Sequence, residues 1–518
     1  MLKNLYHKIR NFHFILLPLF FMLHIINYYY GLIPKDIIWQ HSFAYIALTL
    51  SVFLFAKFYY KDNVRSGLFS FITLSYFFGF GSVKDLMASS KFLSHFDSYS
   101  IMLPAVLILL LLLFIYLKRS NRSFNRIITF LFIATSANLL IEAIFLTKNI
   151  INKNEIKNDL GDPEMTMVKN YIPCDTCTQP DVYYILFDEF TSSRCLKQYW
   201  NYSNDTLINY FRNNHFFVSE KSHSNYSFTN FSVPCTMEMQ YLNLPPDYTE
   251  ASAIDLARGQ YTLYNNTVIN IFEKQGYQFH NYSIYDIKSH PAYNGIYFSK
   301  LTDLFISDET LFGRTMRDIG WNISNPFERN QRKRDSLAHI KTFNIRNPYI
   351  KKTLADAKEA ISTQNKSGKD FFYFHFMLPH DPFIYDSLGN PRSFGYIDIK
   401  FRYLDQVKYT TKILIDLVNY IKETSGNKAV IILQGDHGFK SWPGEENFEE
   451  KAFENLNAIY LPDENYTGYY DGVSPVNTFR LLFNHYFHTN YELLPDKSIQ
   501  LFFKPDLKKI YGIRQKNS

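Results

Sequence analysis

Long apolar runs dominate the first 150 residues of the chain. Five of them approach the roughly 20 residues that a membrane-spanning helix needs. They are Phe14 to Tyr30, Phe43 to Tyr60, Gly67 to Val83, Ile101 to Leu117 and Ile127 to Leu146. Buried core helices would carry an amphipathic stripe, which these runs lack, and a cleaved signal peptide fits only the first. The pattern predicts five transmembrane helices in residues 1–147.

Basic residues gather in alternate loops between these runs. The three clusters are Lys3, Lys8 and Arg10; Lys57, Lys61 and Arg65; and Lys118, Arg119, Arg122 and Arg126. They come before the first run, between the second and third, and between the fourth and fifth. By the positive-inside rule these loops face the cytoplasm. An odd number of spans then places everything after about residue 147 on the extracytoplasmic side.

The pattern changes from Asp181 onward, where short apolar strands alternate with helical stretches. Strands are predicted at Asp181 to Phe187, Phe216 to Val218, Asp370 to Leu378, Lys428 to Leu433 and Leu456 to Leu461. Helices are predicted near Leu196 to Asn213, Val268 to Gln275, Ile350 to Thr363, Tyr403 to Glu423 and Ser474 to Tyr486. This alternation is typical of βα units on a mainly parallel sheet. Residues 148–180 are polar and are interpreted as a linker or bridging helix to an α/β domain over residues 181–518.

Charge and cysteine content narrow the picture. The net charge of +6 is modest for 518 residues, and the basic residues form no stripe with aromatics, which argues against nucleic-acid binding. The four cysteines are Cys174, Cys177, Cys195 and Cys235. The first two have zinc-site or redox spacing, but no second pair lies nearby and the motif precedes a strand. Because the space outside the inner membrane is oxidising, all four are candidates for structural disulfides.

Possible metal ligands follow three of the predicted strands. Asp188 and Glu189 follow the first, His380 the strand from Asp370, and Asp436-His437 the strand from Lys428. Ligands of doubly wound sheets bind beyond the carboxyl ends of the strands, where all of these fall. Taken singly, each also fits a helix cap, a polar turn or a structural histidine.

Hydroxyl groups cluster between Thr229 and Thr236, just ahead of a predicted helix. Ser232-Val233-Pro234 resembles a helix start with proline in the first turn. A threonine or serine hydroxyl is a poor nucleophile until a base or a metal activates it. The residues alone do not choose between Thr229 and Ser232.

Four segments, in this order, resemble the alkaline phosphatase and sulfatase superfamily. They are Phe187-Asp188-Glu189-Phe190, Thr229 to Cys235, Pro379-His380-Asp381-Pro382-Phe383 and Gly435-Asp436-His437-Gly438. With the five predicted spans, the chain is similar to the phosphoethanolamine transferases and lipoteichoic acid synthases of bacterial envelopes. The resemblance implies a three-layer α/β/α domain anchored in the inner (cytoplasmic) membrane, with that domain in the periplasm or outside the cell.

The resemblance also implies a site and a reaction. Thr229 would accept the phosphoryl group as a phospho-threonine, and His380 would contact the phosphate or protonate the leaving group. Asp188, Thr229, Asp436 and His437 would hold one divalent metal ion, zinc or manganese. The implied reaction moves a phospho-substituent, such as phosphoethanolamine or phosphoglycerol, from a membrane lipid donor to an envelope lipid or glycan acceptor. The enzyme is expected to be a monomer.

Two departures from those families leave alternatives open at the site. Glu189 stands where relatives with an aspartate ligand usually have glycine, so the ligand is either Asp188 or Glu189, with Asp188 favoured. No histidine follows the Asp-His pair before residue 456, and Lys440 and Asn455 are the substitutes considered for that substrate contact.

A third departure bears on the reaction. Sulfatases carry a modified Cys or Ser two residues before proline and usually an Arg after it; here Ser232 and Pro234 are followed by Thr236. Sulfuric ester or phosphodiester hydrolysis therefore ranks below phosphoryl transfer. A non-catalytic membrane scaffold is the remaining alternative, and the presence of the ligand quartet argues against it.

Overall fold

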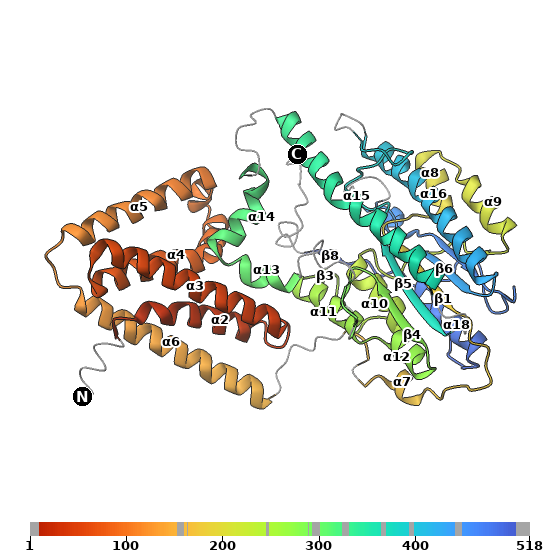
Figure 1. Ribbon diagram of the computed structural model, residues 1–518, viewed down its shortest axis with the longest axis horizontal. Helices are drawn as coiled ribbons and strands as arrows, with labels where there is room; N and C mark the ends of the chain where they lie inside the picture. The colour runs from red at the N-terminus through yellow and green to blue at the C-terminus, as the bar shows by residue number, and fades with distance from the viewer. Residues whose placement is uncertain are drawn as a thin grey trace. The chain divides into compact units, whose positions relative to one another are not determined.

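In the computed structural model the chain forms two compact units (Figure 1). It describes residues 10–152, 160–162, 164–244, 248–288, 290–292, 301–323, 331–363, 369–392, 398–440 and 448–503. Within the described residues, the first unit comprises residues 10–152 and 301–323, and the second comprises the remainder.

All five apolar runs form helices in the first unit. They are α2 (Leu16–Tyr28), preceded by the 3₁₀ turn η1 (His13–Ile15), α3 (Lys35–Tyr60), α4 (Asn63–Ser89), α5 (Tyr99–Arg119) and α6 (Asn125–Asn152). The last four are long and apolar enough to cross a membrane. At 1.5 Å per residue, α2 reaches only about 20 Å, short of a roughly 30 Å hydrocarbon core. The described residues therefore hold four candidate spans and one shorter apolar helix, where five spans were expected.

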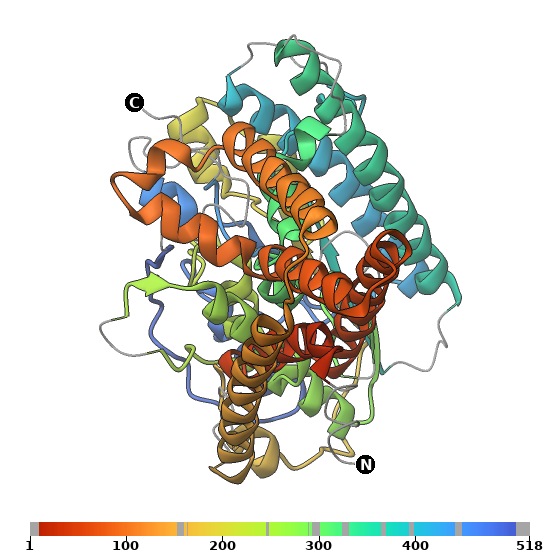
Figure 2. The ribbon, with the colours of Figure 1, turned by 90° about the vertical axis from the view of Figure 1, so that its left-hand side faces the viewer.

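The first unit also contains a helical pair from far along the chain, α13 (Leu301–Ser307) and α14 (Leu311–Ile323). The Gly81 backbone amide of α4 donates to the Glu309 carbonyl at 2.9 Å, between the two helices of the pair. Figure 1 labels α13 and α14 in green beside the red and orange helices of the unit, and Figure 2 views those red and orange helices from the front. The unit also contains η2 (Leu93–Phe96). The residue pattern had assigned this segment to the second domain.

The second unit is built on a six-stranded mixed sheet with the order β2-β7-β6-β1-β5-β4. The strands are β1 (Val182–Phe187), β2 (Phe217–Val218), β4 (Gln278–Tyr282), β5 (Asp370–Phe376), β6 (Val430–Gly435) and β7 (Asn457–Tyr460). Strands β4, β5, β1 and β6 run parallel, and β7 is antiparallel to β6. Phe187, at the end of β1, is in register with Phe376 and Gly435. The segments that follow these three strands therefore leave the same edge of the sheet.

Helices cover both faces of this sheet, which confirms the expected three-layer α/β/α architecture (Figure 1). One face packs against α10 (Thr229–Glu238), α12 (Thr267–Lys274) and α18 (Thr478–Tyr486). The other packs against α8 (Ser193–Trp200), α9 (Asp205–Asn213), α15 (Gln331–Thr363) and α16 (Ile399–Ser425). The remaining elements are α7 (Thr166–Asn170), α11 (Ala253–Tyr264), α17 (Phe448–Phe453), η3 (Pro475–Asn477), and β3 (Glu250–Ala251) paired with β8 (Phe502–Phe503).

Only one of the expected disulfides is present. Cys174 and Cys177 are joined, whereas Cys195 and Cys235 are free and buried. Cys195 lies on α8 and Cys235 on α10, and these helices cover opposite faces of the sheet. The sheet between them prevents the pairing, so the prediction was wrong for these two residues.

Candidate functional site

Helix α10 begins at Thr229, three residues before the predicted start at Ser232. Phe228 is the N-cap, has an extended backbone and provides no capping side chain. Ser232 lies one turn inside the helix and is buried, whereas Thr229 is partly exposed. Pro234 falls inside the helix and cannot donate to the Asn230 carbonyl. Proline therefore does not mark the first turn here, and Thr229 occupies the helix N-terminus.

The carboxyl ends of β1 and β6 bring three possible metal ligands together beside Thr229. Ligand atoms of Asp188, Asp436 and His437 all lie within 4.8 Å of one another. His437 Nε2 is 3.5 Å from Asp188 Oδ1 and 3.3 Å from Asp436 Oδ2. Thr229 Oγ1 is 3.3 Å from the same nitrogen. Four residues separated by up to 249 positions thus face one point.

The hydrogen bonding of this cluster fits a divalent cation. Asp188 Oδ1 and Asp436 Oδ2 are buried and have no hydrogen-bond partner among the described residues. The Gly438 carbonyl, 2.7 Å from His437 Nδ1, can only accept, so Nδ1 carries the proton and Nε2 presents a lone pair to the cluster. Buried carboxylate oxygens without partners are costly unless a cation compensates them. Two carboxylates and an imidazole suit zinc or manganese.

Charge coupling perturbs the pKa values of the cluster. Burial raises the pKa of Asp436 to about 6, and the nearby Asp188 adds to the shift. Burial alone would raise the pKa of Asp188, but the charge of His380 and a hydrogen bond from His375 hold it well below its usual range. The buried His437 has its pKa lowered by burial, so its ring is neutral.

Two histidines approach Asp188 from β5 and the loop after it. His375 Nε2 is 3.5 Å from Asp188 Oδ2, and His380 Nε2 is 3.9 Å from Oδ1. Burial would lower the pKa of His380, but Asp188 and Asp381 raise it to about 10. Asp381 Oδ1 lies 2.9 Å from His380 Nδ1. The role of Asp381 was missed from the sequence, although the adjacent His-Asp pair was a signal for it.

Glu189, which follows β1, is hydrogen-bonded to the segments that follow β5 and β6. Its Oε1 accepts from the Lys440 amide at 2.7 Å and its Oε2 from the Asp381 amide at 3.4 Å, while its own amide donates to Asp436 Oδ1 at 3.0 Å. It also lies in a second group of possible ligands with His380 and Asp381. Burial raises the pKa of Glu189 to about 7. Asp188 is thus the carboxylate that lies with Asp436 and His437.

The two residues considered for substrate contact are placed differently. Lys440 Nζ lies 4.6 Å from the centre of the Phe228 ring, and Phe228 directly precedes Thr229 in the chain. Asn455 is fully buried. Its side-chain Nδ2 donates to the Gly435 carbonyl at 2.6 Å, and its Oδ1 accepts from Ser222 Oγ at 2.9 Å. Because both ends of this amide are engaged in the framework, Asn455 does not fit the substrate contact predicted for it.

Glycines flank the Asp-His pair for reasons of space. A Cβ on Gly435 would stand 2.2 Å from the Phe190 carbonyl oxygen, and one on Gly438 would stand 2.0 Å from that of Lys451. Neither glycine has a positive φ. They are needed because the neighbouring backbone approaches too closely for a side chain, and not because the chain turns there.

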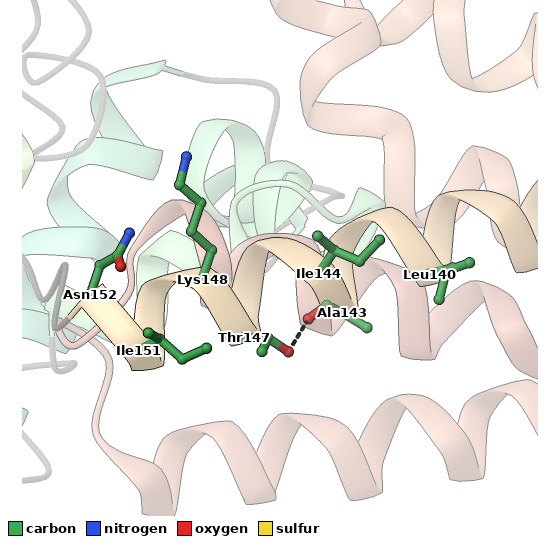
Figure 3. A pocket seen from close by; sticks show the side chains of 7 residues that line it. All are labelled: Leu140, Ala143, Ile144, Thr147, Lys148, Ile151 and Asn152. Atoms are coloured by element: carbon green, nitrogen blue, oxygen red, sulfur yellow. Dashed lines mark hydrogen bonds between the residues drawn. The ribbon is translucent and has the colours of Figure 1, made fainter.

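A shallow hollow along α6 lies outside this cluster (Figure 3). Its lining residues are Leu140, Ala143, Ile144, Thr147, Lys148, Ile151 and Asn152. The Thr147 hydroxyl is satisfied by the Ala143 carbonyl at 2.8 Å. The hollow contains one cation and no candidate nucleophile with a base, so the strand ends remain the candidate site.

A protein-family model described as Sulfatase matches residues 180–478. No curated protein matches the chain.

Solved structures similar to the chain include three bacterial proteins. The periplasmic domain of EptC from Escherichia coli is 10% identical, with a TM-score of 0.37, and the match covers 63% of this chain and 88% of that one. The phosphoethanolamine transferase EptA from Neisseria meningitidis is 10% identical over 98% of both chains, with a TM-score of 0.37. The lipoteichoic acid synthase LtaP from Listeria monocytogenes is 12% identical over 65% of this chain and 80% of that one, with a TM-score of 0.34.

Proposed function

The chain belongs to the sulfatase family, and from that premise we propose that it is a metal-dependent membrane enzyme that transfers a phospho-substituent. The donor is a lipid head group and the acceptor is a hydroxyl of an envelope lipid or glycan. One observation carries the proposal: the partly exposed Thr229 hydroxyl, at the N-terminus of α10, lies 3.3 Å from His437 in the ligand cluster. A hydroxyl so placed can attack phosphorus in a substrate that approaches the strand ends.

Asp188, Asp436 and His437 would hold the ion, with Thr229 beside them. A divalent ion, when bound, polarises a phosphoryl oxygen and lowers the pKa of a neighbouring hydroxyl. Because no side chain caps α10, its first turn offers backbone donors and a positive dipole end to the anionic group. The protein thus presents a nucleophile and an anion site at one helix terminus.

The proposed cycle has two displacements at phosphorus. Thr229 Oγ1 gives its proton to water and bonds to phosphorus, while the bond from phosphorus to the lipid alcohol breaks. His380 protonates the departing alcohol, a role that its raised pKa favours. An acceptor hydroxyl then gives its proton to His380 and displaces Thr229 from phosphorus. Thr229 recovers a proton from water, and both side chains return to their starting states.

The competing reaction within the family is hydrolysis of a sulfuric ester or a phosphodiester, with Ser232 as the reacting residue. Its hydroxyl is buried one turn inside α10 and has no hydrogen-bond partner among the described residues. Thr229 is partly exposed and contacts the ligand cluster. Accessibility therefore supports Thr229 as the nucleophile over Ser232.

Two features support an extracytoplasmic position for the catalytic unit. By the positive-inside rule, the basic loops favour a position outside the cytoplasm for the C-terminal end of α4 and the N-terminal end of α5. Residues of α14, which is far downstream in the chain, pair with Asp85 and Tyr99 at those same ends. This pairing supports a downstream chain on the side where these helix ends emerge, in the periplasm or outside the cell.

Mass spectrometry of the full-length protein tests the reaction. The protein is incubated with vesicles of phosphatidylethanolamine or phosphatidylglycerol and no acceptor, and its peptides are then analysed. We expect phosphoethanolamine or phosphoglycerol on Thr229, retained in Thr229→Ser at a lower level and lost in Thr229→Ala. An aldehyde or ester at residue 232, or lipid cleavage that persists in Thr229→Ala, would exclude the phospho-threonine route.

A further inference from the structure

Helix α14 has its charged residues on the packed face and its apolar residues on the open face. The side chains of Arg314 and Arg317 are 7% and 9% exposed. Phe312 and Met316, four residues apart and so on one side of the helix, are 68% and 46% exposed. A surface helix of a water-soluble protein has the reverse arrangement, with the apolar stripe inward.

The buried charges of α14 are paired within the first unit. Arg314 forms an ion pair with Asp85 of α4, and Arg317 forms ion pairs with Asp308 and Asp318. The Tyr99 hydroxyl of α5 donates to Asp318 Oδ2 at 2.7 Å. These contacts hold α14 by its polar face against the ends of α4 and α5.

The backbone before α14 is also held closely. A Cβ on Gly81 would stand 2.7 Å from the Asp308 carbonyl oxygen, and Ser82 Oγ donates to Glu309 Oε2 at 3.0 Å. In α13, Asp303 Oδ1 is 2.6 Å from His41 Nε2 of α3. The segment is therefore docked through several contacts along its length, which fixes the side that α14 turns outward.

The apolar face of α14 continues a surface that is already suited to lipid. Leu86 and Ile101, at the neighbouring ends of α4 and α5, are 64% and 44% exposed. Both helices are long and apolar enough to span a membrane. Helix α14 thus turns its polar face to the protein and its apolar face outward, next to the ends of apolar helices. This arrangement is expected of a helix at the bilayer interface.

We propose that α14 is an interfacial helix whose Phe312–Met316 face inserts into the outer leaflet of the lipid bilayer. The partner is the lipid surface itself, and the proposal does not depend on the reaction catalysed. The chain leaves the first unit after α6 and returns to it with α13 and α14. This second attachment would tie the catalytic unit to the membrane surface at a point distinct from the linker.

Depth measurement by spin labelling tests the proposal. The full-length protein with Phe312→Cys or Met316→Cys is labelled with a nitroxide in vesicles of phosphatidylethanolamine and phosphatidylglycerol. Leu388→Cys is the matched control, because Leu388 is an apolar residue of the second unit that is 70% exposed. The unsubstituted chain, whose free Cys195 and Cys235 are buried, gives the background. Collision rates with oxygen, which partitions into lipid, and with a water-soluble nickel chelate are then compared.

At both α14 positions we expect an oxygen-to-nickel collision ratio several-fold higher than at residue 388. A ratio equal to that of the control would place the face in water and overturn the proposal. Shielding from both reagents, with spin–spin broadening between labels on different chains, would assign the face to a second copy and overturn it equally.

Discussion

Gly259 of α11 supports the start of α10 through direct backbone contact. A Cβ at this position would stand 1.9 Å from the carbonyl oxygen of Asn230, the residue after Thr229. The Asn230 side chain is bound to the same helix, since its Nδ2 donates to the Leu256 carbonyl at 3.1 Å. The substitution Gly259→Ala therefore presses on the nucleophile's neighbour without touching a proposed ligand.

The size of the effect follows from this distance. Contacts of Cβ atoms under 3.0 Å are essentially never seen, so the two backbones must separate by about 1.1 Å, the difference between that limit and 1.9 Å. A misplacement of about 1 Å can cost on the order of 100-fold in rate. Alanine favours the interior of α11 by about 1 kcal/mol over glycine, which offsets part of the strain. We expect a folded protein whose turnover is reduced about 100-fold.

The assay is release of diacylglycerol from phosphatidylethanolamine and phosphatidylglycerol vesicles by the full-length protein. Metal content is measured in parallel and should be unchanged, because Asp188, Asp436 and His437 lie on strand ends and not on α10 or α11. Gly79→Ala is the control, since a Cβ there meets nothing within 4 Å. Turnover near the unsubstituted rate, in folded Gly259→Ala protein, would refute the claim that the start of α10 positions the reacting group.

Three further results are expected. Asp188→Asn should weaken metal binding by at least about tenfold in calorimetric titration, and Glu189→Gln should weaken it less; the opposite order would make Glu189 the ligand. Burial raises the folded-state pKa of Asp181 to about 6, above an unfolded value of about 3.9, so stability falls as pH rises through this window. Asp181→Asn, which keeps an acceptor for the Asp370 amide, should raise the free energy of unfolding at pH 8 by about 1–2 kcal/mol after allowance for partial exposure, and should leave it unchanged at pH 4. Thermal melts at the two pH values measure this, and equal gains at both would contradict it. Cys174→Ser should destabilise the second unit by about 2 kcal/mol, as expected for closure of so short a loop, and reductant should then no longer lower Tm; a further fall would mean that another disulfide forms.

The place where the ligands gather was readable from the residues. Apolar runs mark where β1 and β6 end, and parallel pairing carries those ends to one edge of the sheet. Asp188 and Asp436 therefore meet although 248 positions separate them in the chain. The hydrogen bond from the Glu189 amide to Asp436 joins residues that are 247 positions apart. The three-layer architecture could be predicted for the same reason, because alternating βα units leave few other ways to bury both faces of a sheet.

The features that were not predicted depend on contacts between distant segments. Ser232-Val233-Pro234 carries a local signal for a helix start, but tertiary packing extends α10 back to Thr229. The engagement of Asn455 with Gly435 and Ser222 leaves no trace in local sequence. Residues 301–323 follow a strand-and-helix region, and contacts with distant helices reveal that they belong with the apolar helices. Examples are the Arg314–Asp85 ion pair with α4 and the Tyr99–Asp318 hydrogen bond with α5.

Three glycines allow close backbone contacts around the segments that carry the site, and these contacts explain how the geometry of the site is maintained. Gly259 faces the start of α10, while Gly435 and Gly438 flank Asp436-His437; at each, a Cβ would come within 2.2 Å of a backbone oxygen. None has a positive φ, so proximity and not conformational freedom is the reason for glycine. Backbone-to-backbone contacts cannot relax by rotating a side chain, so they hold Thr229 and the ligand pair in a fixed relation before any ion or substrate arrives. Such preorganisation suits a transfer reaction, in which one nucleophile must serve two successive displacements at the same point.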